Sequence, residues 1–156
     1  NSYVAELDLG DIWYDTEPTS SVFTVGNEAM VNYNSSSTYV AYCFSGVEGF
    51  SKFGSYVGNG NSNGSFIFTG FKPAFFLVKQ IGDISWYMYD NKRDTINPVD
   101  NELNPHNNQA EASGHDLDFL SNGVKMRTSD SSLNYNNYTY IYMAFAESPY
   151  KYSRAR

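Results

Sequence analysis

The stretch that decides the fold is residues 38–60, TYVAYCFSGVEGFSKFGSYVGNG. It begins with an apolar and aromatic run, continues through a second run broken by glycines, and ends on Gly58-Asn59-Gly60. Gly and Asn tolerate positive φ angles, so this tripeptide predicts a tight turn. Two apolar runs with a break between them and a turn after them are typical of antiparallel β-structure.

The same pattern recurs along the chain. Further strands are predicted at about residues 3–9, 21–25, 66–68, 74–79, 85–89, 116–120, 124–128 and 138–146. Asn122-Gly123 between two such runs is the strongest hairpin signal. No segment has apolar residues at helical spacing. We therefore predict an all-β fold, an antiparallel, jelly-roll-like β-sandwich with about ten strands and little or no helix.

The composition supports a packed core. The 156 residues suit an ordinary domain and include 14 Tyr, 11 Phe and 2 Trp, residue types that favour strands and bury large areas. A net charge of -7 argues against nucleic acid and against an anionic membrane surface. No apolar run reaches the roughly 20 residues of a membrane helix. We therefore predict neither nucleic-acid binding nor membrane insertion.

The single cysteine, Cys43, excludes an intrachain disulfide, and we expect it to be a small buried hydrophobe. The chain has no initiator Met, which suggests a segment of a longer polypeptide.

A weak internal repeat is visible. Asn32-Tyr33-Asn34 matches Asn134-Tyr135-Asn136, and residues 38–44 (TYVAYCF) match residues 139–145 (TYIYMAF). Two aromatic strands can resemble each other through composition alone, but the ordered matches favour a repeat. We predict that residues 1–45 are the closing strands of a preceding repeat-like unit, packed on a main β-sandwich domain of residues 46–156. Together they would form a single compact domain.

One candidate ligand site lies in the segment WYMYDNKRD. Aromatic rings beside planar polar groups suit sugar faces and hydroxyls, and the segment supplies Trp86, Tyr89, Asp90, Asn91 and Arg93. Alternatively, Asp90 and Arg93 form a structural salt bridge that fixes the following loop. That loop, residues 90–114, is long and polar, so it is either functional or a packed Ω-type excursion.

A metal or catalytic site is not predicted. His115, Asp116 and Asp118 are weak metal candidates, because their spacing lacks a zinc pattern and suits calcium poorly. The sequence has no nucleophile elbow and no readable glycosidase carboxylate pair. We predict no metal, no cofactor and no enzyme activity.

Several motifs carry a family resemblance. In order, these are TYVAYCF with EGFSKFGSYVGNG, TGFKPAFFLVK, WYMYDNKRD, DLDFLSNGVKMRTS and YIYMAFAESPYKY. Over roughly residues 13–156 the chain resembles an uncharacterised all-β domain common in tail-fibre and other structural proteins of marine bacteriophages. That family usually has a His after its CF pair, and Ser45 stands there in this chain. The difference weakens any metal-binding proposal at that position.

The resemblance implies a virion structural module of a phage tail fibre or related appendage, with contact to host-surface glycans as a further role. It implies other virion subunits as partners, a homo-oligomer such as a trimer, host-surface polysaccharide as a ligand, and a location on the particle surface, outside cells. The alternatives are a non-viral carbohydrate-binding module and an extracellular fibre-forming structural protein.

Overall fold

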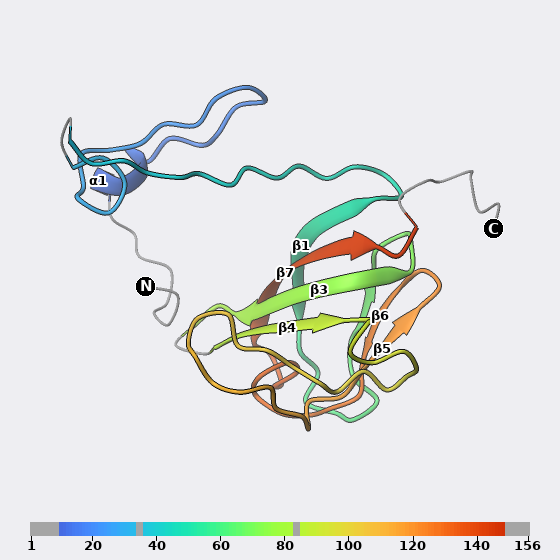
Figure 1. Ribbon diagram of the computed structural model, residues 1–156. Coiled ribbons are helices and arrows are strands. Elements are labelled where there is room, and N and C mark those ends of the chain that lie inside the picture. Colours follow the sequence, from blue (N-terminus) through green and yellow to red (C-terminus); the bar gives the residue numbers. More distant parts are fainter. Residues whose placement is uncertain (1–9, 34–35, 83–84, 149–156) are drawn as a thin grey trace. The chain divides into compact units, whose positions relative to one another are not determined.

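A computed structural model describes residues 10–33, 36–82 and 85–148 (Figure 1). Contacts divide the chain into two compact units. Of the described residues, 10–33 and 36–44 form the N-terminal unit, and 45–82 and 85–148 form the main unit.

The N-terminal unit contains one helical turn, α1 (Gly10–Trp13), and its described residues form no strand. The strands predicted at residues 21–25 and 38–44 are therefore wrong for this chain, and the one predicted at residues 3–9 lies outside the described residues. An alternating apolar segment becomes a strand only when neighbouring strands take its backbone hydrogen bonds. Cys43 lies on this segment and is exposed, contrary to expectation.

The main unit is built from two antiparallel sheets, which confirms the predicted all-β class. The described strands are β1 (Ser51–Val57), β2 (Phe66–Phe68), β3 (Pro73–Gln80), β4 (Trp86–Asp90), β5 (Leu117–Leu120), β6 (Gly123–Met126) and β7 (Thr139–Ala146). One sheet has the order β1-β7-β3-β4 and the other has the order β2-β6-β5. The described residues thus contain seven strands rather than about ten. None of the described helices is long and apolar enough to cross a membrane.

The hairpin predicted at Asn122-Gly123 is confirmed, and the main unit contains a second hairpin. β3 pairs with β4, and β5 pairs with β6 across a two-residue turn, with Leu120 opposite Gly123. β7 is a central strand, because it pairs with β1 on one side and with β3 on the other. The main four-stranded sheet therefore depends on a strand that comes after all its other members in the sequence.

Both sheets contribute to one hydrophobic core. The buried members are Ile67, Phe71, Phe76, Val78, Tyr89, Val99, Leu117, Phe119, Val124, Met126, Leu133, Tyr140, Tyr142 and Ala144. Tyr140 stacks on Tyr56 with ring centroids 4.9 Å apart, and Tyr142 stacks on Phe76 at 5.7 Å. Aromatic residues of β7 therefore link its two neighbours in the sheet to the core.

The glycine and asparagine loop at residues 59–65 is anchored by one buried side chain. Asn134 is 0% exposed. Its Oδ1 accepts from Asn59 N at 3.0 Å and from Ser65 N at 3.5 Å. Its Nδ2 donates to Asn59 Oδ1, to the Asn61 carbonyl and to the Thr128 carbonyl, at 2.8–2.9 Å. These bonds tie the loop to the turn before β7.

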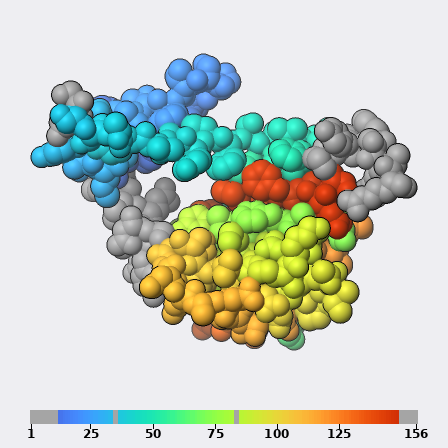
Figure 2. All heavy atoms as spheres, in the orientation of Figure 1, coloured from blue at the N-terminus to red at the C-terminus, as the bar shows by residue number. Residues whose placement is uncertain are grey.

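The long polar loop after β4 is packed against the main unit, as one of the two sequence-based interpretations expected. Backbone bridges join Met88 to Leu103, Val99 to Leu117 and Glu102 to Ala112. The loop is yellow to orange in Figure 2, where it forms a continuous part of the surface.

Candidate functional site

The predicted ligand-binding residues of β4 differ in how far they are buried. Tyr89 is completely buried, and its hydroxyl donates to Glu102 Oε2 at 2.8 Å. Trp86 is only half-buried, at the start of the strand. The ring of Tyr89 is therefore removed from any surface site, whereas Trp86 can still be reached from solvent.

The turn after β4 is closed by Asp90 and Arg93. Asp90 Oδ1 accepts from the backbone N–H groups of Lys92 and Arg93, and Asp90 Oδ2 accepts from Arg93 Nε at 2.7 Å. Arg93 also donates to the Met88 carbonyl, and it lies 3.4 Å from Glu111. Partial burial acts to raise the pKa of Asp90, but the bonds from Arg93 and Lys92 outweigh it and lower that pKa. Asp90 and Arg93 thus form the structural salt bridge that the sequence offered as the alternative to a ligand site.

Asn91 is bonded away from this turn, since its Nδ2 donates to Glu147 Oε1 at 3.0 Å. Glu147 also pairs with Lys72 at 2.9 Å. The predicted residues Trp86, Asp90, Asn91 and Arg93 are close in sequence, yet three of the four have their polar groups engaged within the chain.

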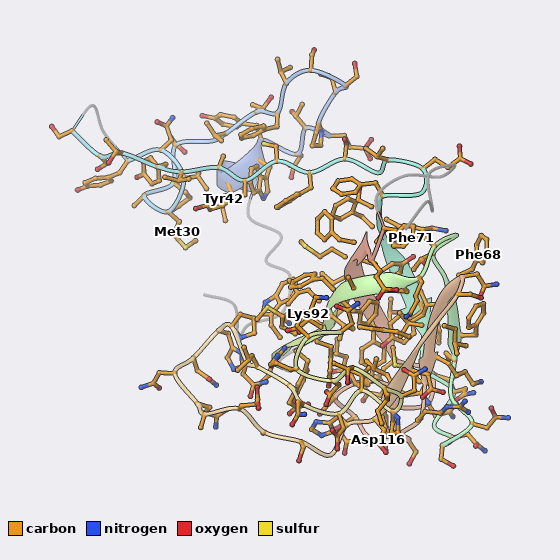
Figure 3. All side chains as sticks on the ribbon, turned by 45° about the vertical axis from the view of Figure 1, so that its right-hand side comes forward. Met30, Tyr42, Phe68, Phe71, Lys92 and Asp116 are labelled. Atoms are coloured by element: carbon orange, nitrogen blue, oxygen red, sulfur yellow. The ribbon has the colours of Figure 1, made fainter. Side chains whose placement is uncertain are left out.

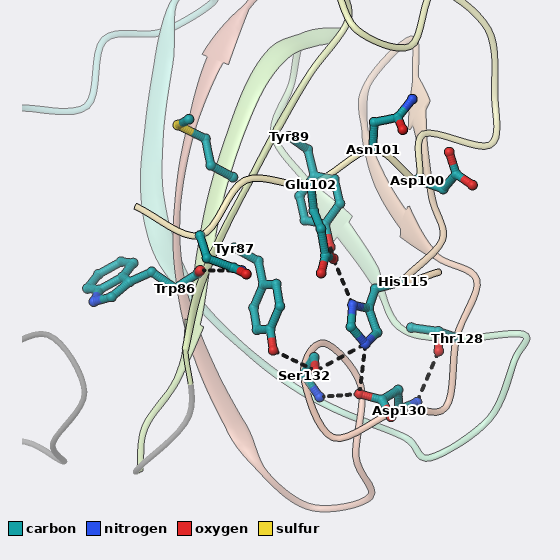
Figure 4. Close-up of polar contacts among 12 residues, drawn as sticks. Trp86, Tyr87, Tyr89, Asp100, Asn101, Glu102, His115, Thr128, Asp130 and Ser132 are labelled. Carbon is teal, nitrogen blue, oxygen red and sulfur yellow. Dashed lines mark hydrogen bonds and ion pairs between the residues drawn. The ribbon is translucent and has the colours of Figure 1, made fainter. Parts of the chain in front are cut away.

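A second polar group surrounds His115, and we call it the His115 cluster: Tyr87, Tyr89, Glu102, His115, Asp130 and Ser132 (Figure 4). His115 Nδ1 lies 2.7 Å from Glu102 Oε2. On the other side, its Nε2 lies 3.3 Å from Ser132 Oγ and 3.4 Å from Asp130 Oδ1. The cluster thereby joins the long loop to the turn that precedes β7.

The electrostatics of the cluster favour a protonated imidazole. The hydrogen bond with Glu102 raises the pKa of His115; burial opposes this, and the charges of Glu102, Asp130 and Asp116 add to the increase. Burial tends to raise the pKa of Asp130, but bonds from Ser132 and the charge of His115 hold it below its usual value. Burial, followed by the charge of Glu102, raises the pKa of the Tyr89 hydroxyl.

Ser132, His115 and Glu102 are in contact in the same arrangement as the nucleophile, base and orienting acid of a hydrolase triad. Three observations argue against that chemistry. Ser132 is 6% exposed. Its hydroxyl donates to the Tyr87 hydroxyl at 3.0 Å. The raised pKa of His115 favours its charged form, which has no free acceptor nitrogen for the Ser132 proton. The arrangement suits a partly buried polar clamp better than a hydrolytic site.

The His115 cluster predicts a particular pH dependence of stability. Because the folded pKa of His115 is raised, its stabilising contribution is complete below its ordinary pKa of about 6.5 and is lost as the pH rises through the folded value. We expect the stability difference between wild type and His115→Gln, measured by urea unfolding from pH 5 to 9, to favour wild type most at the acidic end. A difference that stays constant or grows with pH would contradict the clamp.

The three weak metal candidates are not brought together as ligands. His115 faces Glu102 and Asp130, and Asp118 Oδ2 accepts from Arg127 Nε at 2.6 Å. Among the described residues, no group of three or more His, Cys, Asp or Glu side chains is arranged to hold a metal ion.

Sequence reasoning missed the partners of His115. The acids near it in sequence were considered, but Glu102 reaches it across the long loop and Ser132 comes from beyond β6. A buried carboxylate needs partners, and Glu102 stands where the loop pairs with itself, opposite Ala112. No local sequence pattern marks that position.

Comparison with protein families matches residues 2–149 to "Domain of unknown function (DUF7483)". The chain belongs to this family. The match spans both units. No curated protein and no solved structure matches the chain.

Proposed function

We propose that this member of the family is a non-catalytic structural module of a phage tail fibre or related appendage, carried on the outside of the virion. The phage setting is supported by the order and spacing of the motifs from TYVAYCF to YIYMAFAE. In this role the partners are other virion subunits, with a homo-oligomer such as a trimer as the working assembly.

The observation that carries the structural role is the internal use of polar groups. Both oxygens of Asp90, the guanidinium of Arg93 and the imidazole of His115 bind groups of the same chain. Binding and catalytic sites leave such groups aimed at a ligand, whereas here they close turns and anchor a loop. The single core shared by both sheets further supports a jelly-roll-like β-sandwich as the finer description of the fold.

Contact with host-surface glycans is a second candidate, favoured by one surface feature. Tyr135 and Tyr138 are both exposed and form an edge-to-face pair with ring centroids 5.1 Å apart. Exposed tyrosine rings beside asparagine amides suit sugar faces and hydroxyls. Asn136 and Asn137 lie between them in the sequence.

Two measurements test these proposals. Mass spectrometry of purified phage particles is expected to find peptides of this chain at the abundance of a structural protein, and their absence would overturn the virion role. A glycan array probed with the whole chain is expected to show no saturable binding if the role is purely structural. Binding lost in Trp86→Ala or in Tyr135→Ala/Tyr138→Ala, but kept in the surface control Ile96→Ala, would establish the glycan role instead.

A further inference from the structure

The turn that precedes β7 is present twice in this chain. Before β7, the Leu133 and Asn134 N–H groups donate to the Asp130 carbonyl at 3.3 and 2.8 Å. In the N-terminal unit, the Val31 and Asn32 N–H groups donate to the Glu28 carbonyl at 3.0 and 2.8 Å. Each pair of donors occupies matching positions of the sequence repeat, so the repeat has the same backbone geometry at both places.

The side chains of the two turns also make matching bonds. Asn134 Nδ2 donates to the Thr128 carbonyl at 2.8 Å, and Asn32 Nδ2 donates to the Gly26 carbonyl at 3.0 Å. These carbonyls precede their asparagines by the same number of residues. In both copies, therefore, the asparagine side chain bonds to the backbone just before the turn.

A tyrosine completes each turn. The Tyr140 hydroxyl accepts from Tyr135 N at 2.9 Å and donates to the Ser131 carbonyl at 2.7 Å. The Tyr39 hydroxyl accepts from Tyr33 N at 2.9 Å and donates to the Ala29 carbonyl at 2.7 Å. Composition alone does not reproduce a network of this kind, so residues 26–44 are a second copy of the segment that ends in β7.

The two copies differ in what lies beside the strand. β7 is paired with β1 and β3, and its Tyr140 is buried. Residues 38–44 form no strand, and Val40 and Tyr42 are 78% and 81% exposed. Figure 3 shows Tyr42 on this extended segment.

We propose that residues 38–44 are a β7-type strand that completes a second body of this same fold, by inserting between strands equivalent to β1 and β3. The surroundings of β7 indicate what this second body must provide for residues 38–44. Its place in the main unit shows that the segment needs an antiparallel neighbour on each side, including a ring that stacks on Tyr39 as Tyr56 stacks on Tyr140. The inference does not depend on the virion role.

A second requirement concerns Asn32. Asn134 Oδ1 accepts from two N–H groups of the loop at residues 59–65, whereas Asn32 is exposed and its side chain is bonded only to Gly26 among the described residues. The second body would therefore supply a loop equivalent to residues 59–65 to the Asn32 amide. Modules of this fold would then be joined in series, each closed by a segment that leads directly into the next.

The test is a fusion in which residues 45–127 are followed directly by residues 26–156, so that residues 26–44 occur only once in it. In it, the first body has lost its own closing segment and can be closed only by residues 26–44. The matched control joins residues 45–146 to residues 46–156, so that the first body keeps all of β7. We measure hydrogen exchange by mass spectrometry over residues 38–44 in the wild type and over the corresponding closing strand in each fusion.

In the wild type, residues 38–44 are expected to exchange rapidly. In the test fusion, they are expected to exchange at least about 100-fold more slowly, close to the rate of β7. Slow exchange already in the wild type would overturn the proposal, because the strand would then be paired within the chain. Fast exchange in the test fusion with a folded control would also overturn it.

If neither fusion folds, a single-chain variant decides. This variant gives residues 140–145 of β7 the sequence of residues 39–44, through the substitutions Ile141→Val/Tyr142→Ala/Met143→Tyr/Ala144→Cys. It is expected to be at least as stable as Tyr142→Ala alone, and a clearly lower stability would overturn the proposal.

In a folded test fusion, Asn32→Ala is expected to lower the melting temperature of the first body while leaving that of the wild-type chain unchanged. An equal effect in both would overturn the loop assignment.

Discussion

Asn134→Ala is expected to destabilise the main unit by about 3 kcal/mol. The side chain is fully buried and makes five hydrogen bonds, to the loop at residues 59–65 and to Thr128. Its removal takes these partners from partly buried backbone groups and frees the loop from the turn before β7. Urea unfolding followed by circular dichroism measures the loss.

Asn32→Ala is the matched control for this substitution. Asn32 occupies the equivalent turn in the N-terminal unit, but it is exposed, and among the described residues its side chain bonds only to the Gly26 carbonyl. The unfolding transition of the main unit is expected to shift by less than about 0.5 kcal/mol. Equal losses in the two variants would show that the loop anchoring is not what makes Asn134 important.

Gly58→Ala is expected to cost about 3 kcal/mol as well, because there is no room for a methyl group at this position. An added Cβ would lie 2.7 Å from the Asn134 carbonyl carbon and would overlap the Tyr135 carbonyl oxygen. Both atoms belong to the backbone of the turn before β7, which cannot yield as a flexible side chain would. Gly58 also exchanges backbone hydrogen bonds with Tyr138 and Asn137, at 2.9 and 3.0 Å.

Gly46→Ala serves as the control for added side-chain bulk. A Cβ there would meet only the Ser51 carbonyl oxygen, at 3.9 Å, which is ordinary van der Waals contact. The change is expected to alter the unfolding free energy by less than about 0.5 kcal/mol. If Gly58→Ala proved equally mild, the close approach of the end of β1 to the turn before β7 would be wrong.

The sequence predicted the parts of the fold that depend on local chemistry. Asn122-Gly123 located the β5–β6 hairpin, and the aromatic run at residues 138–146 located β7. Residues 38–44 carry the same run, yet they form no strand, because a strand also requires neighbours that the local sequence does not describe.

The candidate sites were harder to predict, because their partners are distant in the sequence. The salt bridge of Asp90 and Arg93 spans three residues and was foreseen as an alternative. The sequence suggests a ligand surface for Tyr89, but Tyr89 is the one buried residue of β4 and its hydroxyl bonds to Glu102. The pairing of His115 with Glu102 depends on how the long loop folds back, which no local signal describes.

The central position of β7 also affects how the chain can be made. During synthesis, β1, β3 and β4 leave the ribosome well before β7. The edges of β1 and β3 that pair with β7 therefore stay without hydrogen-bond partners until β7 has emerged. Pairings across such long separations form slowly, and open strand edges are prone to aggregation while they wait. Efficient production of this domain is therefore expected to depend on slow synthesis, low temperature or a chaperone that covers those edges.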